Sequence, residues 1–362
     1  MSCKFDEIPG LLFVSDNALS IEILKSDAFS VVSLVGYLSK LQVSSGIDFE
    51  RLIKFISFSP FFIEGEQHQR TKKIFSNMLG KPQINCWQAN FEKKIEQVTK
   101  EFECTNDSDL VNYCFDIAKN LLRPMLFGFE ATLPDDFEIR LYKLQKLVEP
   151  LLSIRQLLKL QDELNYLLSC LENCLQNDAE SNVDSLFTDL SSETTTNEFS
   201  YEDKLMLLLM IYGAKTPLIQ TMSNIFLEIL VINKEKYFSA GIFDDAYFRK
   251  ELDKIIHKSA ALLHIHRVAN KDFRCGDIFI KSGSFVLLDI ADQPANSCGA
   301  FKSLSFGMGM HYCSGAVISK AIIAMVVPTF FKIYPHATAS AWEFDSTIHT
   351  AKSLTTLKVK TR

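Results

Sequence analysis

Apolar residues recur at spacings of three and four along most of this 362-residue chain, and few segments alternate between apolar and polar residues. Recurrence at this spacing places apolar side chains on one face of a helix. Only 14 glycines and 10 prolines interrupt it, so the pattern predicts a mainly α protein with small β-sheets. The predicted helices include residues 18–26, 68–78, 86–102, 110–126, 137–144, 154–175, 202–232, 246–256 and 316–331.

Two short segments have the composition of β-strands. Residues 10–15 form one predicted strand, and residues 277–290 form a predicted hairpin with its turn at 281–283. The polar segment 176–200 separates two helical patterns that resume directly on either side, which is typical of a surface connection. We therefore predict one domain over residues 1–362.

The composition excludes some classes of protein. A hydrophobic fraction of 47% allows a large core, and a net charge of −6 gives no overall attraction to nucleic acids or anionic membranes. The first ten residues show no apolar run after basic residues. We therefore expect no signal peptide, no membrane anchor and a cytoplasmic protein.

An apolar run at residues 205–214 lies within the long predicted helix 202–232. A transmembrane helix is one interpretation, but Lys215 and Pro217 interrupt the run before the ~20 residues that a bilayer requires. The central buried helix of a large domain is the interpretation that we prefer.

Cys313 differs in its context from the other eight of the nine cysteines, which lack the spacing of a zinc site or a small disulfide scaffold. It follows a glycine-rich segment and precedes the apolar predicted helix 316–331. The partial positive charge and unpaired N–H groups at a helix N-terminus stabilise a thiolate. Glycines let the backbone approach a flat ligand closely, and Phe306 offers a ring beside the sulfur.

Residues 306–315 resemble the haem-binding signature of the cytochromes P450 at every defined position. The resemblance implies the cytochrome P450 fold, with haem b between the long central helix and the thiolate loop and Cys313 as the ligand to the iron. The signature positions in this chain are Phe306, Gly307, Gly309, His311, Cys313 and Gly315.

Haem propionates need cationic partners because carboxylates are costly in an apolar pocket. The resemblance implies His68 and Lys72, which the i, i+4 spacing places on one helical face, together with Arg267 and His311. A solvated basic helix would also explain His68 and Lys72. The pair His264 and His266 also suggests a metal site, yet no third ligand stands at useful spacing.

The chain departs from the family pattern in two structural segments. Glu251 and Lys254 stand where the family has a Glu-x-x-Arg pair, so one ammonium replaces a bidentate guanidinium. Between Asp289 and Phe306 there are too few residues for the arginine-containing meander of the family. We therefore expect a trimmed proximal face.

The segment 212–217 aligns with the oxygen-activating segment of the family. Thr216 matches its threonine and Gly213 its glycine, but Lys215 replaces the acid and Pro217 predicts a kink. An ammonium donates protons only if burial lowers its pKa. Alternatively, Lys215 binds a substrate carboxylate, as a cation does in the fatty-acid peroxygenase branch, or points outward while Thr216 works with water.

The resemblance implies a monooxygenase that oxidises an apolar small molecule, by family analogy in natural-product biosynthesis. Its electrons would come from a ferredoxin- or flavodoxin-type donor, for which Lys72, Lys73, Lys81 and Lys302 offer positive charge unless they are merely solvated. A peroxide-driven or redox-neutral enzyme and a non-catalytic haem- or ligand-binding protein remain alternatives.

Overall fold

The computed structural model of the chain describes residues 3–4, 11–102, 108–128, 132–149, 152–177, 185–186, 199–290, 303–346 and 350–361. They form two compact units. The first comprises Met1–Val32, Leu79–Ile117 and Pro217–Arg362, and the second Ser33–Met78 and Ala118–Thr216. Each unit combines segments that lie far apart in the sequence. The single domain over residues 1–362 stays a prediction.

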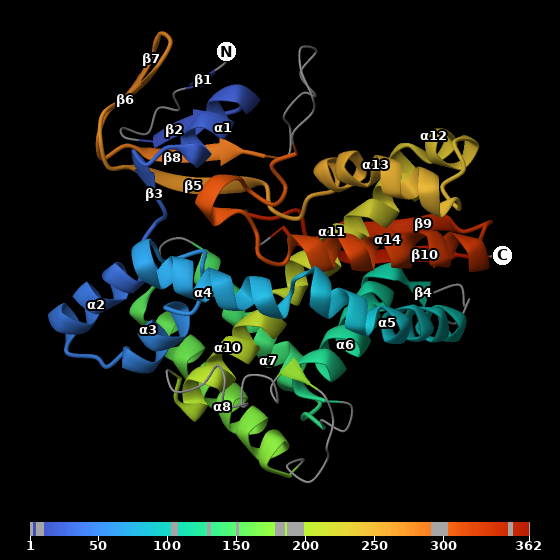
Figure 1. The fold of residues 1–362 in the computed structure, drawn as a ribbon, viewed down its shortest axis with the longest axis horizontal. Coiled ribbons are helices and arrows are strands. Elements are labelled where there is room, and N and C mark those ends of the chain that lie inside the picture. The colour runs from blue at the N-terminus through green and yellow to red at the C-terminus, as the bar shows by residue number, and fades with distance from the viewer. Residues whose placement is uncertain are drawn as a thin grey trace. The chain divides into compact units, whose positions relative to one another are not determined.

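Helices dominate the described residues, so the mainly α prediction is confirmed (Figure 1). The helices are α1 (Asn17–Lys25), α2 (Leu34–Ser45), α3 (Glu50–Ile56), α4 (Gly65–Met78), α5 (Lys81–Glu101), α6 (Leu110–Phe127), α7 (Phe137–Leu144), η1 (Gln145–Val148), α8 (Ile154–Asn177), α10 (Tyr201–Gly213), α11 (Lys215–Leu227), η2 (Glu228–Ile232), α12 (Lys234–Ser239), α13 (Asp245–Lys258), η3 (Gly309–His311) and α14 (Ala316–Ile333). The strands are β1 (Cys3–Lys4), β2 (Leu11–Val14), β3 (Phe29–Ser30), β4 (Ser108–Asp109), β5 (His264–Ala269), β6 (Phe273–Cys275), β7 (Ile278–Ile280), β8 (Phe285–Asp289), β9 (Thr338–Phe344) and β10 (Leu354–Lys360).

The first unit holds the described sheets. The largest has the strand order β1-β2-β8-β5-β3, in which β2 runs parallel to β8 and the other neighbours are antiparallel. A second sheet has the order β4-β10-β9, and β6 pairs with β7. In the same unit α14 packs against α5 and α13.

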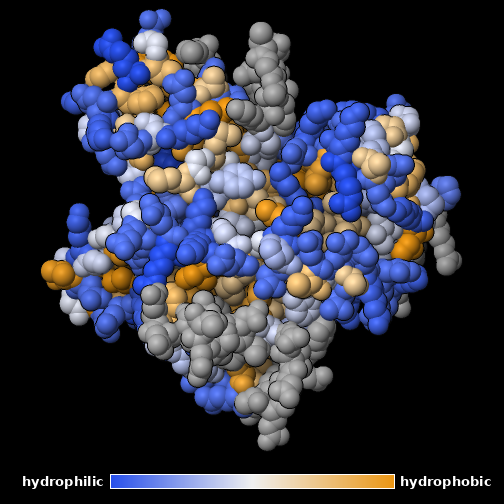
Figure 2. All heavy atoms as spheres, viewed as in Figure 1, coloured by the Kyte–Doolittle hydropathy of each residue, from blue (hydrophilic) through white to orange (hydrophobic). Residues whose placement is uncertain are grey.

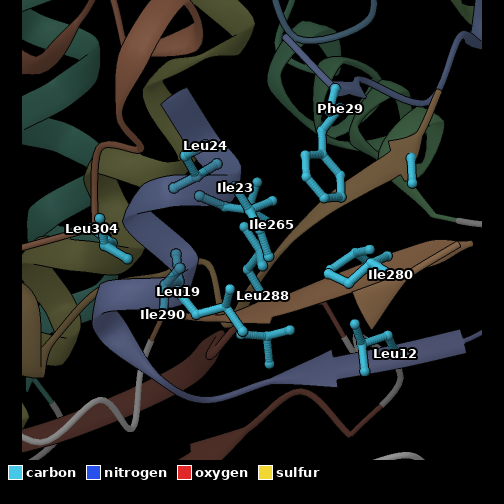
Figure 3. Close-up of a cluster of buried hydrophobic side chains, with 14 residues drawn as sticks. Leu12, Leu19, Ile23, Leu24, Phe29, Ile265, Ile280, Leu288, Ile290 and Leu304 are labelled. Atoms are coloured by element: carbon cyan, nitrogen blue, oxygen red, sulfur yellow. The ribbon is translucent and has the colours of Figure 1, made fainter. Parts of the chain in front are cut away.

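One hydrophobic cluster joins α1 to the five-stranded sheet (Figure 3). Leu19 and Ile23 of α1 pack with Ile265 of β5 and Leu288 of β8. Leu304, nine residues before Cys313, is completely buried in this cluster. The cluster therefore anchors the segment that leads to the cysteine.

The predicted hairpin over residues 277–290 is wrong, although its turn forms. The N–H of Ser284 donates to the carbonyl of Lys281 at 3.1 Å, but β7 pairs with β6 and β8 pairs with β2 and β5. The turn therefore leads from one sheet into another. Local turn residues reveal the change of direction, whereas long-range pairing decides the partners of each strand.

The long helix predicted over residues 202–232 is interrupted at Ala214, between α10 and α11. Pro217 has no N–H to donate to the carbonyl of Gly213, which accounts for an interruption at this place. The start of α10 is a capping box, in which Ser200 and Asp203 bond each other's backbone N–H groups.

Two helical stretches are long and apolar enough to cross a membrane, namely Tyr201–Ile232 and Ala316–Ile333. Most of each stretch is buried inside the protein, as in the core helices of soluble proteins. On the face shown in Figure 2, hydrophilic residues predominate over the described surface. These observations favour the buried-helix interpretation of residues 202–232.

The second unit consists of packed helices, in which α7 lies against α8 and α10. Arg51 and Lys54 of α3 form ion pairs with Glu202 of α10 at 2.9 and 3.0 Å. Arg140 of α7 pairs with Glu163 of α8 at 2.8 Å. Such half-exposed pairs contribute little energy each, and they link α3 to α10 and α7 to α8.

Candidate functional site

The loop around Cys313 is a tight turn that ends at a helix N-terminus. The N–H of Cys313 donates to the carbonyl of Phe306 at 2.8 Å, and the N–H of Tyr312 donates to the carbonyl of Gly309 at 3.1 Å. α14 begins three residues after Cys313, at Ala316. The side chain of Cys313 is exposed at this position. The geometry places a sulfur on the surface of the loop, where the N-terminal end of α14 favours its thiolate.

The loop rests on the C-terminal turn of α1. A Cβ added to Gly309 would stand 2.5 Å from the carbonyl oxygen of Leu24, closer than real Cβ atoms approach. Gly309 also has a φ of +70°, which side chains rarely adopt. Met308 packs against the cluster that contains Leu24. The signature glycine therefore permits close contact between the loop and α1.

We expect Gly309→Ala to lower the free energy of unfolding by about 2–4 kcal/mol, because backbone strain and a backbone clash add together. Gly276→Ala is the matched control, since Gly276 also has a positive φ but has nothing within 4 Å of an added Cβ. It should cost only about 1 kcal/mol. Urea unfolding measures both, and equal losses would contradict the close contact.

Arg267 lies on the face of β5 that meets the cysteine loop. Burial alternates along β5, with Ile265 and Arg267 on the buried face and His264 and His266 on the other. A Cβ added to Gly307 would lie 3.9 Å from Cδ1 of Ile265. Arg267 is 6% exposed, and one of its nitrogens donates to the carbonyl of His266 at 2.7 Å. A buried guanidinium thus shares a strand face with a residue that contacts the loop.

The two histidines of β5 each lie beside an aromatic ring. Among the described residues no group of three or more His, Cys, Asp or Glu side chains is arranged to hold a metal ion. The ring of His264 packs edge-on against Phe13, and the ring of His266 lies 5.7 Å from Phe285. Burial lowers the pKa of His264, although Asp289 opposes the shift. The structure gives the metal interpretation of this pair no support.

The donor set in the first unit fits a haem. An exposed thiol at a helix N-terminus suits iron, and a buried arginine on a neighbouring strand face suits a propionate. Gly315 lies next to the sulfur, since a Cβ added to it would make an ordinary van der Waals contact with Sγ of Cys313 at 3.8 Å. His311 is half-buried in η3. The ammonium of Lys320 lies 5.5 Å from the ring centre of Phe306.

The pair that replaces Glu-x-x-Arg forms on the surface. The Lys254 ammonium lies 3.1 and 3.2 Å from the two oxygens of Glu251, but its side chain is 60% exposed. An exposed ammonium gives a weaker tether than a buried guanidinium fork. The meander segment 291–302, including Lys302, lies outside the described residues.

Lys215 is buried in the second unit, and so it does not point outward. Its ammonium lies 2.8 Å from Oε2 of Glu138 in α7 and 3.6 Å from the ring centre of Tyr212, and its side chain is 3% exposed. The Tyr212 hydroxyl donates to Oε1 of Glu138. Burial lowers the pKa of Lys215, and Glu138 partly offsets this shift. The cation that the sequence revealed therefore has a protein carboxylate as its partner.

Thr216 and Gly213, which the sequence predicts to act in oxygen activation, also contact η1 and α7. The Gln145 amide donates to the Thr216 hydroxyl, and a Cβ added to Gly213 would lie 3.5 Å from Cδ1 of Leu141. Within the second unit the kink thus faces α7. Sequence reasoning missed Glu138 and Gln145, because they lie about 70 residues before their partners and no motif surrounds them.

His68 and Lys72 lie on α4, one helical turn apart. His68 is buried, and its pKa is lowered first by burial and then by the nearby charge of Lys72. A fully solvated basic helix therefore does not describe His68. Lys72 is half-buried, whereas Lys73 and Lys81 are exposed. Their roles at a haem or at a partner surface stay predictions.

Comparisons with known proteins point to one fold. No protein-family model matches the chain. A segment of 173 residues is 26% identical to cytochrome P450 CYP105Q4 of Mycobacterium marinum, and it covers 42% of this chain and only 40% of that protein. Among solved structures, P450BioI in complex with hexadec-9Z-enoic acid ligated acyl carrier protein has a TM-score of 0.80 at 15% identity and matches over 99% of this chain and 93% of its own.

A further solved structure agrees. CYP109E1 of Bacillus megaterium in complex with testosterone has a TM-score of 0.74 at 14% identity and matches over 99% of this chain and 94% of its own. Structural matches at sequence identities this low establish the fold and nothing further. The chain therefore has the cytochrome P450 fold, which agrees with the signature around Cys313 and with the similarity of part of the chain to a curated cytochrome P450.

Proposed function

We propose that the protein is a haem-thiolate monooxygenase that binds haem b through Cys313 and oxidises an apolar small molecule. The observation that carries the proposal is the exposed cysteine at the N-terminal end of α14, on a loop that Gly309 seats against α1. When bound, the haem supplies the oxidising chemistry, and the thiolate increases its electron density.

The residues of the chain hold and shield this chemistry. The Arg267 guanidinium, buried on β5, pairs with a propionate, and His311 in the loop is a second candidate. His68 and Lys72 are proposed for the same role from α4. Thr216 is proposed as the hydroxyl that holds a proton on the oxygen side, with Gln145 fixing its orientation.

The substrate class is proposed from the relatives and the composition. The two solved relatives are described with testosterone and with hexadec-9Z-enoic acid ligated acyl carrier protein, which supports an apolar substrate that is either free or attached to a carrier protein. A ferredoxin- or flavodoxin-type protein is the proposed electron donor, with Lys72, Lys73 and Lys81 as candidate contacts. The place in natural-product biosynthesis remains a family analogy.

The ion pair of Lys215 bears on the competing oxidant. A peroxygenase of the type considered above needs a cation that receives the substrate carboxylate, but Glu138 already binds Lys215 at 2.8 Å. The reductase-dependent route is therefore our first candidate. The exposed Lys254 pair keeps the non-catalytic haem-binding protein as the second.

One experiment separates these functions. Purified protein reconstituted with haem should give, after reduction and addition of carbon monoxide, the absorption maximum typical of thiolate ligation. A product screen with reductase and dioxygen, run beside one with hydrogen peroxide, should then show turnover mainly with the reductase. Turnover with peroxide alone would select the peroxygenase, and ligand-induced spectral shifts without product under either oxidant would select the non-catalytic protein.

A further inference from the structure

Glu138 has both of its carboxylate oxygens engaged inside the second unit. Oε2 lies 2.8 Å from the Lys215 ammonium, and Oε1 accepts a hydrogen bond from the Tyr212 hydroxyl. The Lys215 side chain is 3% exposed and that of Glu138 14% exposed. One ammonium and one hydroxyl thus hold a carboxylate that comes from a different helix, and the ammonium also lies over the ring of Tyr212.

Two further cations lie near Lys215. Arg123 and Lys119 of α6 both act on Lys215 by charge repulsion and lower its pKa further. The Nε atom of Arg123 is buried and has no hydrogen-bond partner among the described residues. Lys215 therefore lies among other cations and has one carboxylate partner at 2.8 Å, and this positive charge would attract another anion if Glu138 were absent.

We propose that Lys215 and Tyr212 form a carboxylate-binding site that Glu138 occupies, and that Glu138 thereby excludes substrates with a free carboxylate in favour of neutral ones. The binding site stands on the contacts alone. The exclusion of substrates rests in addition on the proposed function, because it assumes that substrate reaches this end of α10.

The energetic argument is one of exchange. A substrate carboxylate would have to displace Glu138, which would then lose its cation and its hydrogen bond while remaining half-buried. Such an exchange gains little, because one carboxylate merely replaces another. A neutral substrate leaves the pair intact, so the protein discriminates by the cost imposed on the wrong ligand.

The first test asks whether the site binds a free carboxylate. In Glu138→Ala the side-chain carboxylate is removed and space for a small anion is created. Sodium formate or acetate should then raise the midpoint of thermal unfolding by several degrees in a saturable manner, whereas sodium chloride at equal ionic strength should not. The same salts should have no such effect on wild type or on the double variant Glu138→Ala with Lys215→Met.

This test needs neither haem nor turnover, so it can fail or succeed whatever becomes of the proposed function. An equal response of Glu138→Ala to chloride, or an unchanged response after Lys215 is removed, would overturn the carboxylate site. Glu138→Ser provides the same cavity with a residual hydroxyl if the alanine variant does not fold.

The second test measures specificity by calorimetric binding of decanoate and decanol to the haem-loaded protein. Wild type should bind decanol at least tenfold more tightly than decanoate. In Glu138→Ala the ratio should shift toward decanoate by at least tenfold, and Lys215→Met in that background should remove the shift. A ratio that is the same in wild type and Glu138→Ala would overturn the role of Glu138 in specificity while leaving haem binding and monooxygenation untouched.

Discussion

Replacing Cys313 with serine is expected to abolish the thiolate-type spectrum of the reduced, carbon monoxide-treated protein and to lower turnover by at least about a thousandfold, equivalent to about 4 kcal/mol. A neutral hydroxyl donates far less electron density to iron than a thiolate does. The fold should survive, because the side chain is exposed and the N–H of residue 313 still donates to Phe306.

Cys86→Ser is the matched control, since Cys86 is also exposed but belongs to α5 and not to the loop. It should leave both spectrum and turnover unchanged. Absorption spectra, haem content and product formation of the two variants and wild type, measured side by side, decide whether Cys313 is the iron ligand. A Cys313→Ser variant that keeps the thiolate-type spectrum would exclude this residue as the iron ligand.

Removing one partner of the Glu138–Lys215 pair is expected to cost about 3–5 kcal/mol of unfolding free energy, because a buried charge is left without its counterion. Glu138→Gln tests this with nearly unchanged shape. The double variant Glu138→Gln with Lys215→Met should lose less unfolding free energy than the sum of the two single variants. The difference, which is the coupling energy of the pair, should be about 0.5–3 kcal/mol. Urea unfolding of the four proteins gives the cycle.

The exposed pair of Lys254 with Glu251 is the control for that cycle, because its contribution should stay below about 1 kcal/mol. Similar losses of unfolding free energy in Lys254→Met and Glu138→Gln would show that the buried pair contributes no more to stability than the exposed pair. Additive single effects in the cycle would show that the two side chains do not interact.

The pH dependence of this pair has a definite sign. Burial lowers the pKa of Lys215 in the folded protein below its ordinary value of 10.5. Between the two pKa values the unfolded chain binds more protons, so the contribution of Lys215 to stability rises with pH in that window. Glu138→Gln removes the carboxylate that holds the pKa up, which should extend the rise to lower pH, and Lys215→Met should abolish it.

The sequence by itself determined the helical character, the break in the helix before Pro217 and the tight loop around Cys313, because each depends on residues close together in the chain. Helical spacing and a missing N–H are local properties. The same is true of the glycine at position 309, although only the structure shows that the carbonyl of Leu24 requires it. Helices α2, α3 and α12 and strands β5, β9 and β10 were not among the predicted elements.

Only the tertiary structure decided the pairing of strands and the partners of charged side chains. β8 joins β2 and β5 instead of β7, since pairing depends on which strands the folded chain brings together. Lys215 looked like an open cation or a solvated one, yet α7 places Glu138 beside it. The physical reason is that a buried charge loses its hydration and is stable only beside a counterion. The sequence does not show which of the 44 acidic residues supplies that counterion.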